Sequence, residues 1–213
     1  MSYRAIVIGG SSGSYTALSS VLGMLPADFS LPIIIVLHLH PTDSEGFAEH
    51  LGHETPLTVI EPCDKQMTQP GCVYTVPANY HMLLERDGSI ALSVDKKVNW
   101  SRPSIDVLFE SAACAWQAQL IAVLLSGANC DGMQGMLAVQ QAGGYNIAQD
   151  PTSTKNPVMP QAAITAGAID EVLSTQNIAK RLIDLAALEH CAPKPRSLAS
   201  TRLLKLLPKD SRR

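Results

Sequence analysis

Three polar residues of the kinds used by nucleophilic hydrolases each follow an apolar run of this sequence. Ser11 comes directly after residues 5–10, His38 directly after residues 32–37, and Asp131 shortly after residues 120–125. A serine hydroxyl attacks carbonyl groups only when an imidazole takes its proton, and a carboxylate must hold that imidazole in one tautomer. We therefore predict that Ser11 is a nucleophile, His38 its base and Asp131 the acid that orients the base.

The three apolar runs also predict the fold. They are short, continuous and rich in β-branched residues, a pattern typical of strands buried on both faces of a helix-covered parallel sheet. Ligands of such sheets bind at the carboxyl ends of the strands, where residues distant in sequence converge. We expect an α/β fold of the doubly wound, Rossmann-like type. Its three α/β/α layers are a mostly parallel sheet and the helices on its two faces.

The remaining sequence extends this alternation of strands and helices. Apolar residues at helical spacing predict helices over about 11–24, near 47–51, and over 104–116, 132–142 and 174–188, with strands at 145–149 and 169–173. Residues 72–76 look extended, and Asp87-Gly88 is a two-residue turn that predicts an antiparallel hairpin between 82–86 and 89–94. Residues 151–160 contain three prolines and are expected to form a loop. We assign residues 1–188 to one domain and 189–213 to a basic tail.

Charge and composition limit the classes of function. Residues 1–192 carry 9 basic and 18 acidic side chains, which does not suit nucleic-acid binding, whereas the tail from Pro193 carries seven basic residues and one acid. No apolar run is long enough to cross a bilayer, and the N-terminus does not resemble a signal peptide, so we expect a cytoplasmic protein. The five cysteines show no CxxC spacing and are expected to be reduced thiols, mainly in the core.

Each candidate residue also has an alternative interpretation. Residues 9–14 could form a phosphate-binding turn of a nucleotide-binding reductase, but the spacing is not GxGxxG and His38 stands where a ribose-binding acid is expected. Asp131 could instead cap the helix that follows it.

A helix starting directly after Ser11 would point the N–H groups of Ser12 and Gly13 at a developing oxyanion.

A metal site is a further alternative near the second run. His38 and His40 form a His-x-His pair, with Asp43, His50 and His53 nearby, but their spacing fits no hydrolytic metal motif. We therefore predict a site that uses neither a metal nor a cofactor.

Several segments together resemble the catalytic domain of the CheB methylesterase family. They cover about residues 4–185 in the family's order: Gly9-Gly10-Ser11-Ser12-Gly13, Leu37-His38-Leu39-His40-Pro41, Pro77-x-x-x-His81-Met82, Arg102-Pro103-Ser104-Ile105-Asp106-Val107-Leu108-Phe109, Ser126-Gly127-x-x-x-Asp131-Gly132, Ala148-Gln149 and Met159-Pro160-x-x-Ala163. The resemblance implies that Ser11, His38 and Asp131 are the catalytic residues. It also implies a cytoplasmic enzyme of chemotaxis that hydrolyses γ-glutamyl methyl esters on the cytoplasmic helices of chemoreceptors and releases methanol. Some members of the family also deamidate glutamines there.

The sequence departs from the family pattern at three places. Ser14 replaces a glycine after the nucleophile, Ala128-Asn129 replaces Met-Gly in the segment that bears the acid, and His40 replaces a proline. Typical members also carry an N-terminal receiver domain, whereas the first predicted strand starts here at residue 5, so we expect a free-standing catalytic domain. A catalytically weak binding or scaffold module is the main rival hypothesis.

The basic tail suggests an additional contact. Residues 200–207 place four leucines among Arg202 and Lys205, behind Pro193-Lys194-Pro195. Such a short basic amphipathic stretch is a solvated terminus in many proteins, and its functional interpretation is docking on an acidic partner or a membrane surface.

Overall fold

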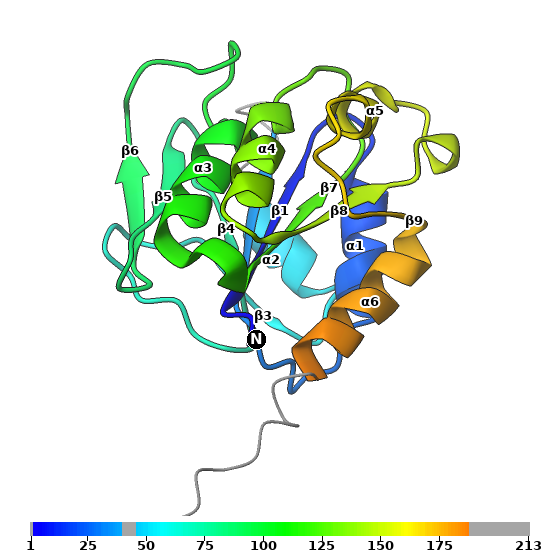
Figure 1. The fold of residues 1–213 in the computed structure, drawn as a ribbon. Helices are drawn as coiled ribbons and strands as arrows, with labels where there is room; N and C mark the ends of the chain where they lie inside the picture. Colours follow the sequence, from blue (N-terminus) through cyan, green and yellow to red (C-terminus); the bar gives the residue numbers. More distant parts are fainter. Residues whose placement is uncertain (1, 40–45, 188–213) are drawn as a thin grey trace, which may run out of the picture.

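A computed structural model describes residues 2–39 and 46–187 of the chain. Seven strands form one parallel sheet in the spatial order β3-β4-β2-β1-β7-β8-β9, and β5 pairs with β6 in a separate antiparallel hairpin (Figure 1). The strands are β1 (Ala5–Gly10), β2 (Ile33–Leu37), β3 (Thr58–Ile60), β4 (Cys72–Thr75), β5 (His81–Leu84), β6 (Ile90–Ser93), β7 (Leu120–Leu124), β8 (Tyr145–Gln149) and β9 (Glu171–Leu173).

Helices cover both faces of the sheet, so the predicted three-layer α/β fold is confirmed (Figure 1). The helices are α1 (Tyr15–Gly23), α2 (Phe47–Gly52), α3 (Ile105–Trp116), α4 (Met133–Gln141), α5 (Val158–Thr165) and α6 (Thr175–Ala187). The first, second and sixth helices bury their apolar residues against one face of the sheet. The helices α3, α4 and α5, together with the hairpin, cover the other face.

The central strands are hydrophobic on both sides because both faces are covered. Every residue of β1, β2 and β7 is buried, as the uninterrupted apolar runs predicted. Alternate residues of one strand face opposite layers: Ile6 and Ile8 pack against α1 and α6, while Ala5 and Val7 pack against α3 and its neighbours.

Four details differ from the sequence prediction. The strand β3 was not predicted, and β4 belongs to the parallel sheet rather than to the antiparallel insertion. Residues 158–160 of the predicted loop form the start of α5, which extends to residue 165. Of the cysteines in the described part of the chain, Cys63, Cys114 and Cys130 are exposed and Cys72 is half-buried, so the prediction of core cysteines was wrong.

No helix in the described part of the chain is both long and apolar enough to cross a membrane. The predicted boundary between the domain and its tail, between residues 188 and 189, lies outside the described residues, which end at 187.

Candidate active site

The register of the central strands brings the first two candidate residues together. Gly10 of β1 pairs with Leu37 of β2, so Ser11 and His38 are the next residues of two adjacent parallel strands. The His38 N–H donates to the Gly10 carbonyl oxygen at 3.1 Å, and the Ser11 N–H donates to the Ser126 carbonyl oxygen at 2.9 Å. Backbone hydrogen bonds therefore hold the ends of β1, β2 and β7 side by side at the carboxyl edge of the sheet.

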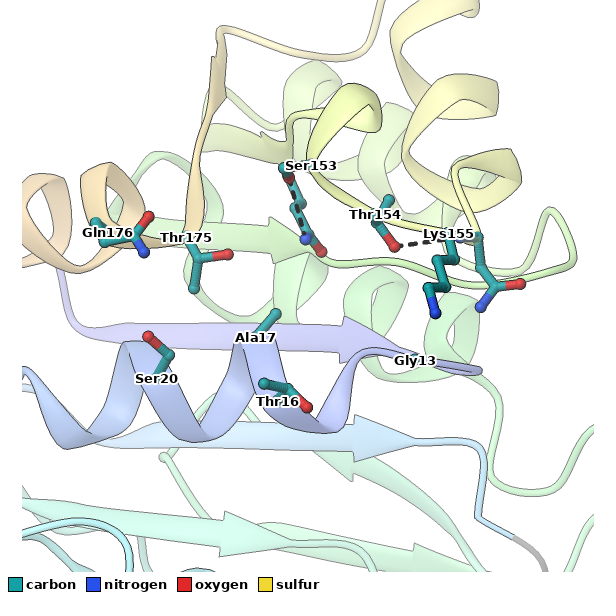
Figure 2. A pocket seen from close by; sticks show the side chains of 11 residues that line it. Gly13, Thr16, Ala17, Ser20, Ser153, Thr154, Lys155, Thr175 and Gln176 are labelled. Atoms are coloured by element: carbon teal, nitrogen blue, oxygen red, sulfur yellow. Dashed lines mark hydrogen bonds between the residues drawn. The ribbon is translucent and has the colours of Figure 1, made fainter.

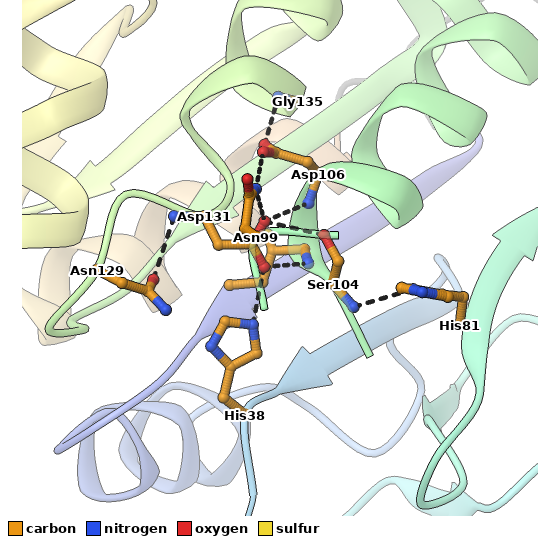
Figure 3. Close-up of polar contacts among 9 residues, drawn as sticks. His38, His81, Asn99, Ser104, Asp106, Asn129, Asp131 and Gly135 are labelled. Atoms are coloured by element: carbon orange, nitrogen blue, oxygen red, sulfur yellow. Dashed lines mark hydrogen bonds and ion pairs between the residues drawn. The ribbon is translucent and has the colours of Figure 1, made fainter. Parts of the chain in front are cut away.

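The third candidate residue contacts the second directly. His38 Nε2 lies 2.8 Å from Asp131 Oδ2, and the Asp131 side chain is fully buried while that of His38 is 12 % exposed (Figure 3). This contact occupies one ring nitrogen of His38 and leaves Nδ1 for another partner. The pair has the geometry of a base and its orienting acid.

Asp131 is also bound by the first residues of α3. Its carboxylate accepts hydrogen bonds from Ser104 Oγ at 2.9 Å, from the Ile105 N–H at 2.7 Å and from the Asp106 N–H at 3.3 Å. The helix that follows Asp131 is instead preceded by Gly132 at φ 94°, without a side-chain cap. The alternative interpretation of Asp131 as a cap of the following helix was therefore wrong, because Asp131 caps α3, a helix that precedes it in sequence.

These donors control the charge of Asp131. Burial alone raises the pKa of the Asp131 carboxyl, but hydrogen bonds from His38, Asn99 and the Ile105 N–H outweigh burial and bring the pKa well below its usual range. An ionised Asp131 stabilises a positive charge on His38, which is what a base needs when it takes up a proton.

Four other residues around Asp131 were not among the predicted site residues. Asn99 Nδ2 donates to Asp131 Oδ1 at 2.8 Å and to Asp106 Oδ2 at 2.7 Å. His81 accepts a hydrogen bond from the Ser104 N–H at its Nδ1, at 3.2 Å (Figure 3). His81, Ser104 and Asp106 stand in the segments that carry the family resemblance, which was the signal available for them. Asn99 lies outside those segments.

The turn after β1 differs from the predicted start of a helix. The helix α1 begins at Tyr15, and a turn closed by the Ser14 N–H donating to the Ser11 carbonyl oxygen at 3.0 Å separates it from β1. Gly13 has φ +81°, and Ser14 Oγ donates to the same Ser11 carbonyl oxygen at 2.6 Å. The N–H groups of Ser12 and Gly13 therefore belong to this turn and not to the helix.

A polar cavity of about 310 Å³ adjoins the same turn. Its walls come from α1, the loop between β8 and α5, and the start of α6, and Figure 2 shows Lys155 and Thr154 facing Thr16 across it. Lys155 is the one charged residue among those that line the cavity. Hydroxyl and amide groups with one cation suit a polar or anionic part of a bound molecule.

The described residues offer no alternative metal centre. Within 2–39 and 46–187, no three His, Cys, Asp or Glu residues are grouped so that they could hold a metal ion. His50 stacks on Tyr15 at 5.7 Å between ring centroids and lies 3.7 Å from Glu54. His40 and Asp43 of the hypothetical metal site lie outside the described residues.

A parallel α/β sheet with a histidine–aspartate pair beside a serine at its carboxyl edge is the framework of a serine hydrolase. The CheB methylesterase family model matches residues 6–182. The chain belongs to the CheB methylesterase family, as the resemblance predicted.

Two relatives of this chain carry the names of two activities. A Leptospira interrogans protein, provisionally named protein-glutamate methylesterase/protein-glutamine glutaminase, is 40 % identical over 185 residues, which are 87 % of this chain and 96 % of that protein. The protein-glutamate methylesterase/protein-glutamine glutaminase 2 of Pseudomonas aeruginosa is 38 % identical over 86 % of this chain, but the alignment spans only 53 % of that protein.

A solved structure shares the fold. The crystal structure of the Thermotoga maritima CheB methylesterase catalytic domain matches with a TM-score of 0.82 and 34 % identity, covering 87 % of this chain and all of that domain. The family assignment disfavours the nucleotide-binding reductase that the glycine-rich turn suggested.

Proposed function

We propose that this protein is a protein-glutamate methylesterase that removes methyl groups from γ-glutamyl esters on the cytoplasmic helices of chemoreceptors. One observation carries the assignment of the catalytic residues: His38 Nε2 lies 2.8 Å from the buried Asp131 carboxylate, at the end of the strand adjacent to Ser11. Family membership supports the reaction.

The residues would act in the order of a two-step acyl transfer. Ser11 Oγ attacks the ester carbonyl carbon, and His38 takes the serine proton and passes it to the departing methoxide, which leaves as methanol. A water molecule, deprotonated by His38, then attacks the acyl-enzyme. The bond to Ser11 Oγ breaks, Ser11 takes the proton back from His38, and the released glutamic acid ionises to its carboxylate. Because Asp131 occupies Nε2 of His38, Nδ1 is the nitrogen that exchanges the proton.

Deamidation of glutamine would use the same residues. The two reactions differ only in the leaving group, methanol or ammonia, and both activities appear in the names of the relatives from Leptospira and Pseudomonas. We propose that glutamine side chains at the same receptor positions are a second substrate.

We also propose a cytoplasmic location, where the receptor helices are accessible. The tail at 189–213 would contribute contact with an acidic partner or the membrane surface, since seven of its residues are basic. These proposals depend on the receptor being the substrate.

The direct test is methanol release from a methylated receptor cytoplasmic fragment. The wild-type protein should release methanol, and Ser11→Ala should lower the rate by several orders of magnitude without changing the far-UV circular dichroism. Ser12→Ala is the matched control, because it removes the exposed neighbouring hydroxyl and leaves the backbone of the turn in place. Equal rates for Ser11→Ala and the wild type would show that Ser11 is not the nucleophile, and no methanol release by the wild type would favour the scaffold module instead.

A further inference from the structure

A single side-chain amide lies between two buried carboxylates beside His38. Asn99 Nδ2 donates one hydrogen bond to Asp106 Oδ2 at 2.7 Å and another to Asp131 Oδ1 at 2.8 Å (Figure 3). A primary amide nitrogen carries two hydrogens, so both are used here. Asp131 is 1 % exposed and Asp106 is 4 % exposed, whereas Asn99 is exposed, which places the amide between the carboxylates and solvent.

In the part of the chain that the structure describes, no cation forms an ion pair with the second carboxylate, that of Asp106. Among the ion pairs of the described residues, Asp131 pairs with His38, which is charged only when protonated, and none of these pairs includes Asp106. Arg102, on the same loop as Asn99, donates its Nη1 to the backbone carbonyls of Val94 and Asp95. The repulsion between the two carboxylates is therefore opposed by neutral donors.

The two carboxylates differ in how they are satisfied. Asp131 accepts from His38, Asn99, Ser104 and two backbone N–H groups, whereas Asp106 accepts from Asn99 and from the Gly135 N–H of α4 at 2.7 Å. The pKa of Asp106 is raised to about 6, mainly by burial and also by the neighbouring Asp131 charge. The hydrogen bonds from Gly135 and Asn99 lower this pKa but do not outweigh burial. The donors thus place the more stable negative charge on Asp131.

The backbone around Asn99 is a tight two-residue turn. Val98 and Ser101 exchange backbone hydrogen bonds at 3.1 and 2.9 Å, and the two central residues have positive φ, 50° at Asn99 and 63° at Trp100. Positive φ at both central positions is the arrangement of a type I′ turn, for which asparagine and glycine are preferred. The turn directs the Asn99 amide to the carboxylates, while Trp100 is 94 % exposed.

We propose that Asn99 is a positioning residue that keeps Asp131 ionised and bound to His38 by donating hydrogen bonds to both adjacent carboxylates, those of Asp131 and Asp106. Its effect on turnover rests on the proposed function, whereas its effect on the two carboxylates does not. Without the amide, Asp106 and Asp131 would face each other with fewer donors, and a proton shared between them would draw Asp131 away from His38.

The first test compares two substitutions in the same turn. Asn99→Gly removes the amide and keeps a residue that adopts positive φ readily, and Trp100→Gly makes the same backbone change at the neighbouring position. On a small γ-methyl ester of glutamate at pH 7, we expect Asn99→Gly to lower kcat about 10- to 100-fold with KM little changed. Trp100→Gly should keep wild-type kcat. Equal kcat values for the two variants would overturn the proposal.

The second test is rescue by removing the other charge. Asp106→Asn in the Asn99→Gly protein abolishes the repulsion, so kcat should recover at least several-fold from the single-variant value. In the pH profile of kcat, Asn99→Gly should move the acidic limb to higher pH. The double variant should return this limb towards its wild-type position. If Asn99 were only a structural residue of the turn, the second substitution would leave the loss unchanged or increase it, and that result would contradict the proposal.

The third test needs no catalysis. A carboxyl group with a raised pKa in the folded state stabilises the protein below its unfolded pKa, and this stability is lost as pH rises through the folded pKa. In urea unfolding, the wild type should lose the Asp106 contribution between about pH 4 and pH 6. Asn99→Gly should extend this loss to higher pH, and the double variant should abolish it, while Trp100→Gly follows the wild type.

The other titratable groups near Asp106 and Asp131 are the same in the wild type and in all the variants compared. They are His38, which directly follows β2, His81, which reaches the pair through Ser104, and Cys130, which precedes Asp131 in sequence. An Asn99→Gly unfolding profile identical to that of the wild type would overturn the proposal. Absence of methanol release by the wild type would instead contradict the proposed function, and the unfolding readout would still decide the role of Asn99.

Discussion

The side chains of Asp131 and Ser11 differ in how much the folded structure depends on their contacts. Asp131 is fully buried, accepts hydrogen bonds from the first residues of α3 and contacts His38, so it serves both folding and the arrangement of the site. The side chain of Ser11 has no comparable structural role among the hydrogen bonds of the described residues. Loss of each residue should therefore have a distinct signature.

We predict that Asp131→Asn lowers both stability and activity, whereas Ser11→Ala lowers activity alone. The new amide N–H₂ would face at least one of the N–H and O–H donors that now point at Asp131, which should cost about 1 to 3 kcal/mol of unfolding free energy. Hydrolysis should fall by about 10³- to 10⁴-fold, because His38 loses its orienting acid. Urea unfolding and methanol release measure the two effects, and wild-type stability of Asp131→Asn would contradict the dual role.

Residue types and their spacing were sufficient to select Ser11, His38 and Asp131 as candidates, because each follows a buried strand of a parallel sheet. Asn99 could not be predicted in this way. It lies on the loop between β6 and α3, and its two contacts, with Asp106 and Asp131, depend on how the loop folds back over the start of α3. Periodicity carries no information on such a contact.

At the scale of the elements, the predictions failed where local sequence is ambiguous. The helix α5 contains Pro160 in its first turn and follows Pro157, and proline is compatible with these positions because the first N–H groups of a helix have no intrahelical partner. The strand β3 has only three residues and lies at the edge of the sheet, so it lacks the buried apolar run that identified the central strands. Tertiary packing decides both elements.

The turn between β1 and α1 positions Ser11 and gives a prediction at this scale. Gly13 has φ +81°, and a Cβ there would lie 2.9 Å from Asn156 Nδ2, at the edge of the polar cavity. Gly13→Ala should cost about 1 to 2 kcal/mol of stability and at least tenfold in kcat, since the turn that carries Ser11 must shift.

Gly167→Ala is the matched control for that change. Gly167 has φ +72°, and a Cβ there would meet no atom within 4 Å, so it has the same backbone penalty without a contact near Ser11. We expect a similar loss of stability in urea unfolding and wild-type kcat. Equal kcat values for the two alanine variants would show that the geometry of the Gly13 turn is not required for the reaction.

For the molecule as a whole, we predict that activity needs no metal ion. A serine nucleophile, an imidazole base and protein hydrogen-bond donors supply the proposed chemistry without one. Dialysis against a chelator should leave methanol release unchanged, with the metal content followed by elemental analysis. If the purified protein contained stoichiometric zinc and lost it together with its activity during dialysis, the result would instead support the hypothetical metal site at His38 and His40.

The basic tail gives the last prediction, which separates the reaction from the encounter with the substrate. Deleting residues 189–213 retains α6, whose buried residues include Leu182 and Leu185, so hydrolysis of a small methyl ester should stay within about twofold of the wild type. Demethylation of membrane-embedded receptors should slow, and the difference should be largest at low salt, where basic residues steer association most strongly. A control that keeps residues 189–213 but has glutamine at their seven basic positions should reproduce the deletion, because the effect is assigned to charge. An equal loss on both substrates would place the tail within the fold of the domain.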